Sequence, residues 1–179
     1  MKNLFFIAIF AIVFSGCFYQ KSGIVLNPYI NNKNLNSHQN YKEISFIKYV
    51  VDNRRDKKAV FLNGDNLNKD IFLESDLEIW FKDALIKELK SNDIIYNLEK
   101  LSIGLTINKF HINITPDEDK NLNAIGEIFV EIKKNSVTTT KRILKNIIEL
   151  ADAKDVLNLK LILEDLAKNL VKQVVENIK

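Results

Sequence analysis

The stretch KLSIGLTINKFHINI, residues 100–114, decides the fold because it alternates apolar with polar or small side chains over a long run. Alternation with a period of two predicts a β-strand with one buried face. The apolar residues of its first half are Leu101, Ile103, Leu105 and Ile107, and those of its second half are Phe110, Ile112 and Ile114. The two halves are out of phase by one residue, which predicts a bulge or a twisted edge near Asn108.

Two segments further along the chain predict that this strand is the first of three. Residues 124–133 place Ile128, Val130 and Ile132 on one face, and residues 136–150, with three consecutive threonines, form the returning strand. Apolar alternations that follow one another with turn residues between them are typical of hairpins. The three segments therefore predict an antiparallel meander.

Two segments before it also favour strands. Residues 43–54 and 57–62 are rich in β-forming residues, and a turn of mixed charge at residues 52–58 joins them. Residues 23–26 are a candidate for one more short strand.

Two segments predict amphipathic helices. In LESDLEIWFKDALIKELKSND, residues 73–93, Ser75 and Glu78 have the spacing of a capping box, so we expect a helix from Asp76 to Lys90. Trp80 lies on the apolar face of this helix and is expected to anchor the core. The second helix spans residues 158–178, and its apolar stripe consists of Leu159, Ile162, Leu163, Leu166, Leu170, Val174 and Ile178.

The order of these elements predicts an α+β fold, in which an antiparallel sheet carries the two amphipathic helices on one face. A chain of 179 residues suits one domain, which we expect at residues 43–179. The composition, 46% hydrophobic and 27% charged, is typical of a globular protein that folds in water. The net charge of +3 arises from charges spread along the chain, so no nucleic-acid partner is expected.

The N-terminus has the layout of a bacterial secretory signal, which we assign to residues 1–16. Lys2 provides the basic start, and an apolar run from Leu4 to Phe14 follows that is too short to span a bilayer. Phe14, Ser15, Gly16 and Cys17 then resemble a lipobox, the site where bacterial lipoproteins are acylated and cleaved, with Phe14 where leucine is more common. The alternative is an ordinary signal peptide with an incidental cysteine, but the chain has one cysteine and it falls at this place.

Acylation of Cys17 would anchor the mature chain without a spanning helix, since two or three acyl chains bind a membrane stably. It would also remove the only thiol. Phe18 follows the cysteine where an aspartate retains enteric lipoproteins at the inner membrane, which favours the outer membrane. Residues 17–42 are rich in asparagine, so we expect an acylated N-terminus and a flexible tether, with His38 as a solvated residue in it.

The sequence offers no catalytic, cofactor or metal motif. His38 and His111 are the only histidines, and His111 is expected to point outward from its strand. The acidic turn Asp117 to Asp119 lacks the ligand spacing and the glycine of a calcium loop. We therefore expect no enzyme activity, no cofactor and no metal.

The lipobox, the helix that leads into an Asn-Asp turn, the strand KLSIGLTINKFHINI with two further strands, and the final amphipathic helix together resemble the YajG family of outer-membrane lipoproteins. The resemblance implies no catalytic residues, and it transfers only Cys17, as the lipid attachment site. It predicts a protein held on the outer membrane by its lipid, with its domain facing the periplasm.

Two functions remain open from the sequence. The first is a structural or protein-binding role in the cell envelope, through a sheet edge or the exposed side of a helix. The second is an auxiliary role in envelope lipid or lipopolysaccharide transport, which predicts an apolar groove between helix and sheet. Exposure of Val171 and Val175 together with Leu161 would indicate a partner surface on the last helix.

Overall fold

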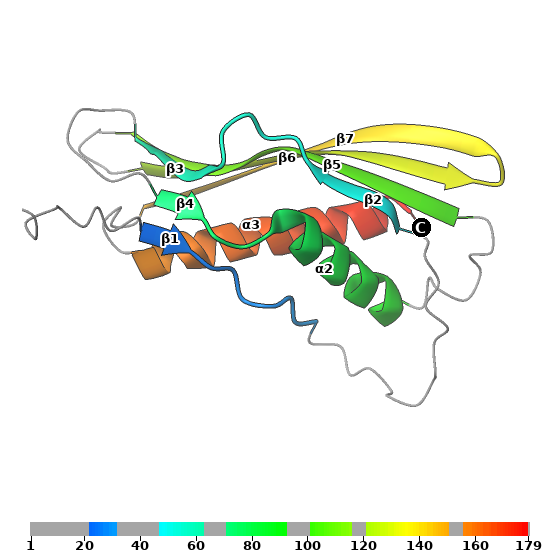
Figure 1. The fold of residues 1–179 in the computed structure, drawn as a ribbon, viewed down its shortest axis with the longest axis horizontal. Helices are drawn as coiled ribbons and strands as arrows, with labels where there is room; N and C mark the ends of the chain where they lie inside the picture. The colour runs from blue at the N-terminus through cyan, green and yellow to red at the C-terminus, as the bar shows by residue number, and fades with distance from the viewer. Residues whose placement is uncertain are drawn as a thin grey trace, which may run out of the picture.

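The sheet is covered on one face by two helices, as Figure 1 shows, which confirms the predicted α+β fold. The computed structural model describes residues 22–31, 47–62, 71–92, 101–115, 121–150 and 156–178. The helices are α2 (Leu77–Ser91) and α3 (Val156–Glu176). The strands are β1 (Ser22–Ile24), β2 (Ile47–Asp52), β3 (Lys58–Leu62), β4 (Ile71–Leu73), β5 (Leu101–Ile114), β6 (Asn121–Lys134) and β7 (Val137–Leu150).

The sheet is mixed, so the prediction of an antiparallel sheet holds only for part of it. Its strand order is β1-β4-β3-β5-β6-β7, and β2 also pairs with β5. Strands β5, β6 and β7 form the predicted antiparallel meander. Strands β2 and β3 both run parallel to β5, and β1 runs parallel to β4.

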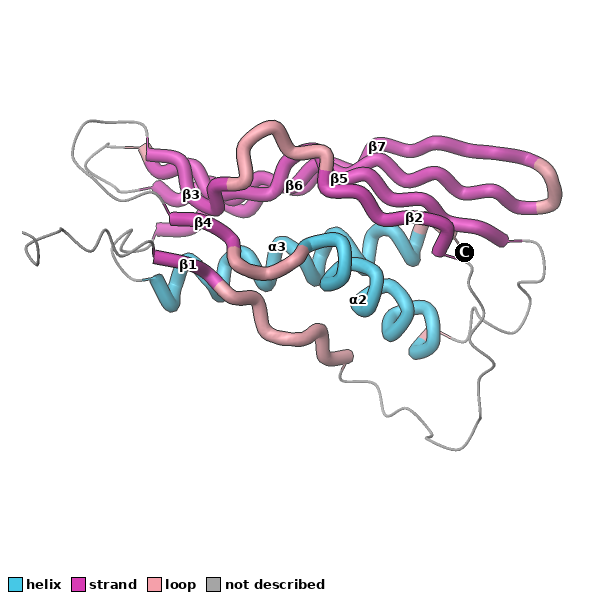
Figure 2. The backbone as a smooth tube through the Cα atoms, viewed as in Figure 1, coloured by secondary structure: helices cyan, strands magenta, loops and turns pink. Residues whose placement is uncertain are grey.

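The predicted bulge lies where the sequence placed it. The register between β5 and β6 shifts between Ile107 and Lys109. Strands β2 and β3 follow one another along the same edge of β5, beside residues 103–107 and 112–114, and Figure 2 shows the loop between them rising out of the sheet. The bulge in β5 therefore coincides with the break between its two neighbours.

Arg54 in that loop is buried and fixes the break. Its Nε and Nη2 atoms each donate to the Asp52 carboxylate at 2.9 Å, and its Nη1 donates to the carbonyl oxygen of Phe110 at 3.1 Å. Burial by itself would raise the pKa of Asp52, but hydrogen bonds from Arg54 and Lys57 outweigh it and hold that pKa below its ordinary value.

The core lies between the sheet and the helices. It includes the inward residues of both halves of β5, together with Trp80 and Phe81 of α2 and the whole predicted stripe of α3. Helix α3 approaches β6 closely, because a Cβ atom on Gly126 would lie 2.6 Å from Cδ1 of Leu170. Val171 and Val175 are buried too, so they form no exposed surface with Leu161.

The predicted capping box of α2 is wrong in its residues. Asp76 is the N-cap, and its Oδ1 accepts from the backbone N–H of Ile79 at 3.1 Å. Ser75 instead accepts from the backbone N–H of Leu26, and Glu78 accepts from the backbone N–H of Asp52. Both side chains bind distant segments because the tertiary structure brings these donors within reach of the helix start.

Candidate functional site

The segment Ser22–Asn31, called the strap below, is packed on the domain. This differs from the prediction that residues 17–42 are a tether and that the domain begins at residue 43. Strand β1 pairs with β4, and Ile24, Leu26 and Tyr29 are only 1%, 4% and 4% exposed. Residues 17–21 and 32–42, with Cys17 and His38, lie outside the described residues.

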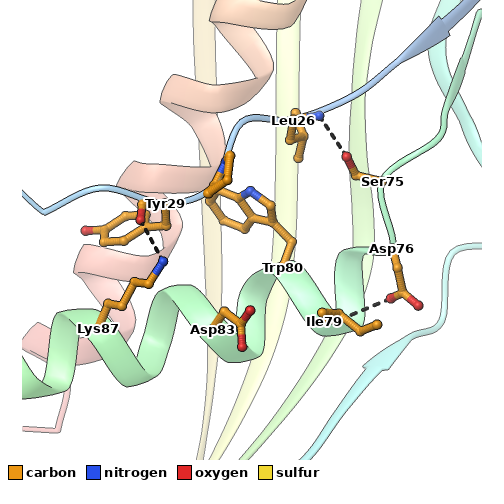
Figure 3. A pocket seen from close by; sticks show the side chains of 9 residues that line it. Leu26, Tyr29, Ser75, Asp76, Ile79, Trp80, Asp83 and Lys87 are labelled. Atoms are coloured by element: carbon orange, nitrogen blue, oxygen red, sulfur yellow. Dashed lines mark hydrogen bonds between the residues drawn. The ribbon is translucent and has the colours of Figure 1, made fainter.

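Helix α2 binds the strap along its length, as Figure 3 shows in part. The Tyr29 hydroxyl donates to the carboxylate of Glu88, which is buried, and the side-chain amide of Asn31 donates to the same oxygen. Lys87 Nζ donates to the carbonyl oxygen of Tyr29 at 3.1 Å, and Trp80 Nε1 donates to that of Asn27 at 2.8 Å. Burial and the neighbouring Glu88 carboxylate raise the pKa of Tyr29 far above its ordinary value, so the phenol stays a neutral donor.

Helix α3 binds the strap at a second buried carboxylate. The backbone N–H of Asn27 donates to Glu164 Oε1 at 2.7 Å, and Lys160 Nζ donates to Asn27 Oδ1 at 3.0 Å. Glu88 and Glu164 are only 6% and 5% exposed, and burying a carboxylate is costly unless it is hydrogen-bonded. Hydrogen bonds from the strap therefore offset part of the free-energy cost of burying both carboxylates.

The sequence contained one signal for this arrangement, which is a glutamate on the apolar face of a helix. Glu88 lies four residues after Ala84 and three after Leu85, on the apolar face of α2. A carboxylate on an apolar face needs a donor, and Tyr29 and Asn31 supply it.

Two small cavities flank Ile79 on α2. One, of about 230 Å³, lies between the strap and α2 beside Leu26, Tyr29 and Trp80, and the other, also about 230 Å³, lies between β2 and α2. Ligand pockets usually measure roughly 300–1,000 Å³. Between the described parts of the sheet and α3, fully buried side chains fill the interface. The described part of the interface between the sheet and α3 therefore contains no open apolar groove.

The edge of the sheet at β7 is open among the described strands. Strand β7 pairs with β6 alone and ends the strand order. Of its 14 residues, Ile143 is the one that is buried, and Val137, Leu144, Ile148 and Leu150 are exposed apolar residues. An unpaired strand edge offers a row of backbone donors and acceptors to another chain.

The sheet face that the helices leave uncovered carries a cluster of charges across three strands. Glu127 of β6 binds Arg142 Nε of β7 at 2.9 Å and Lys109 Nζ of β5 at 3.2 Å. The hydrogen bond from Arg142, helped by Lys109, holds the pKa of Glu127 below its ordinary value. These contacts tie β7 to the sheet on one side, and no described strand pairs with its other side.

His111 points to the same uncovered face, as predicted, with its ring 4.8 Å from the ring of Phe61. Burial and the charges of Lys109 and Arg54 lower its pKa, so the imidazole is neutral at pH 7. The acidic turn Asp117 to Asp119 lies outside the described residues. The described part of the chain gathers no group of three or more His, Cys, Asp or Glu side chains that could hold a metal ion.

No helix among the described residues is both long enough and apolar enough to cross a bilayer. No protein-family model matches the sequence, and no curated protein is significantly similar to it.

Several solved structures resemble this chain at low identity. One is a protein of Xanthomonas campestris from the family DUF330, with a TM-score of 0.49 and 7% identity over 86% of this chain and 92% of that one. A minor lipoprotein from Acinetobacter baumannii has a TM-score of 0.37 and 9% identity over 72% and 94%. A hypothetical protein from Chlamydia trachomatis has a TM-score of 0.37 and 10% identity over 73% and 98%. Similarities this low transfer no function to the present chain.

Proposed function

We propose that this protein is an envelope lipoprotein, anchored through acylated Cys17, whose domain is not catalytic and binds another envelope protein through the open edge of β7. The lipobox-like sequence supports the anchor. The observation that carries the binding role is the 14-residue strand β7, which ends the described sheet with one strand partner. As in the YajG-like lipoproteins that the sequence resembles, the domain would face the periplasm from the outer membrane.

Strand addition is the binding mode that suits this edge. An extended peptide that adds to a sheet gains affinity from main-chain hydrogen bonds and specificity from alternate side chains. On β7, Leu144 alternates with inward residues and offers an apolar contact. Strand β7 also carries Lys141 and Lys145, so the edge is basic as well as apolar. The partner segment expected is an extended strand that carries apolar and acidic side chains.

The basic residues also disfavour pairing of this edge with a second copy of itself. Charged side chains, lysine above all, discourage the edge-to-edge pairing of identical chains. In an antiparallel pair of two β7 strands, Lys141 and Lys145 would face lysines of the second copy and repel them. An acidic segment would neutralise their charges instead.

Site-specific photocrosslinking in intact cells tests the proposal. A photoreactive amino acid is placed at Thr140 and, separately, at Leu144, which lie four residues apart on one face of β7. The control position is Ile79 on α2, which is 61% exposed against 51% for Leu144. The attachment points in any partner are then mapped by mass spectrometry.

Strand addition predicts that both β7 probes attach to one extended segment of one partner, four residues apart, and that the Ile79 probe does not. Attachment at scattered positions, or the same products from Ile79, contradicts strand addition at β7. The anchor is checked separately, because Cys17→Ala should move the protein from the membrane fraction to the soluble fraction.

A further inference from the structure

The strap begins close to Cys17 in the sequence. If Cys17 carries the lipid, as proposed above, five residue steps separate it from Ser22, where β1 begins. A fully extended chain covers at most about 3.6 Å per residue, so Ser22 lies within about 18 Å of the acylated residue. The contacts of Asn27 and Tyr29 with both helices prevent the strap from lengthening this reach.

The described chain begins at one end of the molecule. In Figure 1 the start of β1 and the start of α3 lie together at the left end of the long axis. The strand register brings the end of β7 to the same end, because Leu150 pairs with Asn121 and the neighbouring Leu122 pairs with Ile114, the last residue of β5. This end of the molecule is called the anchor end below.

Exposed apolar side chains gather at the anchor end. They come from the last three residues of β7 and from the first six of α3. These residues, the anchor-end patch, are Ile148, Leu150, Val156, Leu157 and Leu161.

Both elements lose this apolar character with distance from the anchor end. On α3, exposed Leu157 and Leu161 are followed on the same side by Asp165, Lys168 and Lys172. On the outward side of β7, Ile148 and Leu150 are followed toward the other end by Asn146, Leu144, Arg142, Thr140 and Thr138, so the only apolar side chain beyond the patch on this face is Leu144. On two elements from different layers, exposed apolar side chains are thus most frequent at the anchor end, which is the pattern of a surface that meets an apolar boundary at one end.

Resting on the acylation of Cys17, we propose that the anchor end lies against the phospholipid surface, with the anchor-end patch in contact with lipid and the long axis pointing away from the membrane. Two features together select lipid as the occupant: the short free chain holds this end at the bilayer, and the exposed side chains there are aliphatic. Strand β7 rises about 3.3 Å per residue, so its hairpin end stands roughly 40 Å from the anchor end. The basic part of the β7 edge is thereby held clear of the membrane, where a partner can reach it.

Depth-dependent fluorescence quenching of the acylated full chain tests the orientation. Leu161→Cys and Val137→Cys each introduce one free thiol, because the chain's only natural cysteine carries the lipid. The two positions are matched in exposure, at 52% and 65%. Leu161 lies in the second turn of α3, which starts at the anchor end, and Val137 is the first residue of β7, whose last residue lies at the anchor end. Each variant is labelled with an environment-sensitive dye and bound to phosphatidylethanolamine and phosphatidylglycerol vesicles that contain nitroxide-labelled phosphatidylcholine. Circular dichroism confirms that both labelled proteins are folded.

The expected result is that the dye at residue 161 shifts to the blue and loses most of its emission to the nitroxide, while the dye at residue 137 keeps its emission. If the protein floats with the vesicles but the two dyes respond alike, the orientation is wrong and the anchor stands. If the acylated chain does not float with the vesicles, the anchoring proposal fails, and the orientation fails with it.

Discussion

Removal of one hydroxyl group from the strap should measurably destabilise the whole domain. In Tyr29→Phe the buried ring remains, and the structure loses only the hydrogen bond from the hydroxyl to the Glu88 carboxylate. A buried hydrogen bond to a charged group contributes roughly 1.5–3 kcal/mol to stability. Asn31 and Asn92 still donate to Glu88, so the carboxylate is not left without partners, and we expect a loss near the lower end, about 1.5 kcal/mol.

Urea unfolding at neutral pH, followed by circular dichroism, measures this loss. Tyr49→Phe is the matched control, because Tyr49 lies over Gly104 and its hydroxyl makes no hydrogen bond among the described residues. The control should stay within about 0.5 kcal/mol of the wild type. Equal stability of Tyr29→Phe and Tyr49→Phe would refute the claim that the strap is held through Glu88.

The pH dependence gives a second check on the same contact. The folded-state pKa of Tyr29 is raised, so the contribution of the neutral phenol is fully present below its unfolded pKa of about 10 and is lost only as the pH rises through the raised value. The difference between wild type and Tyr29→Phe should therefore stay constant from about pH 6 to about pH 9. A difference that vanishes within this range would contradict the assignment of the donor.

Three further substitutions test other parts of the structure. Gly126→Val should destabilise by about 1–3 kcal/mol in urea unfolding, since its side chain would collide with buried Leu170, and a neutral effect would contradict the close approach of α3 to β6. Trp80→Ala should cost about 3–5 kcal/mol, measured by thermal unfolding, because the indole is buried and bound to the strap; a loss below about 1 kcal/mol would place it outside the core. The pKa of Glu127 is lowered by Arg142, so its contribution is present above the unfolded pKa of about 4.3 and lost as the pH falls through the folded value. Wild type should exceed Glu127→Gln by up to about 1 kcal/mol at pH 7 and by less at pH 3, and a gap that grows in acid would reverse this assignment.

The long elements were predictable because their signals are local. Strand β5 with its bulge, strands β6 and β7, and helices α2 and α3 all follow from the spacing of apolar residues over short windows. The outward position of His111 and the burial of Trp80 follow from the same spacing. The cap of α2 was misassigned to Ser75 because serine and aspartate are both favoured at the N-cap. In the folded protein the Ser75 hydroxyl accepts from the distant backbone N–H of Leu26, and Asp76 caps the helix.

Pairing direction was not predictable in the same way. Strands β2 and β3 are short and run parallel to β5, a choice that depends on how the chain travels between them and not on their own side chains. Strand β4, three residues long, has no pattern of its own and exists because β3 and β1 pair with it on either side.

By itself, the sequence determined the α+β class, the periods of the long strands and helices, and the core residues that those elements contribute, because these depend on side-chain type at short spacing. Only the tertiary structure decided that Ser22–Asn31 is a fixed strap, because its buried side chains Ile24, Leu26 and Tyr29 belong to a segment too short to bury them by itself. Its partners Trp80 and Glu164 lie 53 and 137 residues away from Asn27 along the chain. The segment becomes ordered when its apolar side chains join the core and donors and acceptors on two packed helices satisfy its polar groups, and those helices meet only in the folded domain.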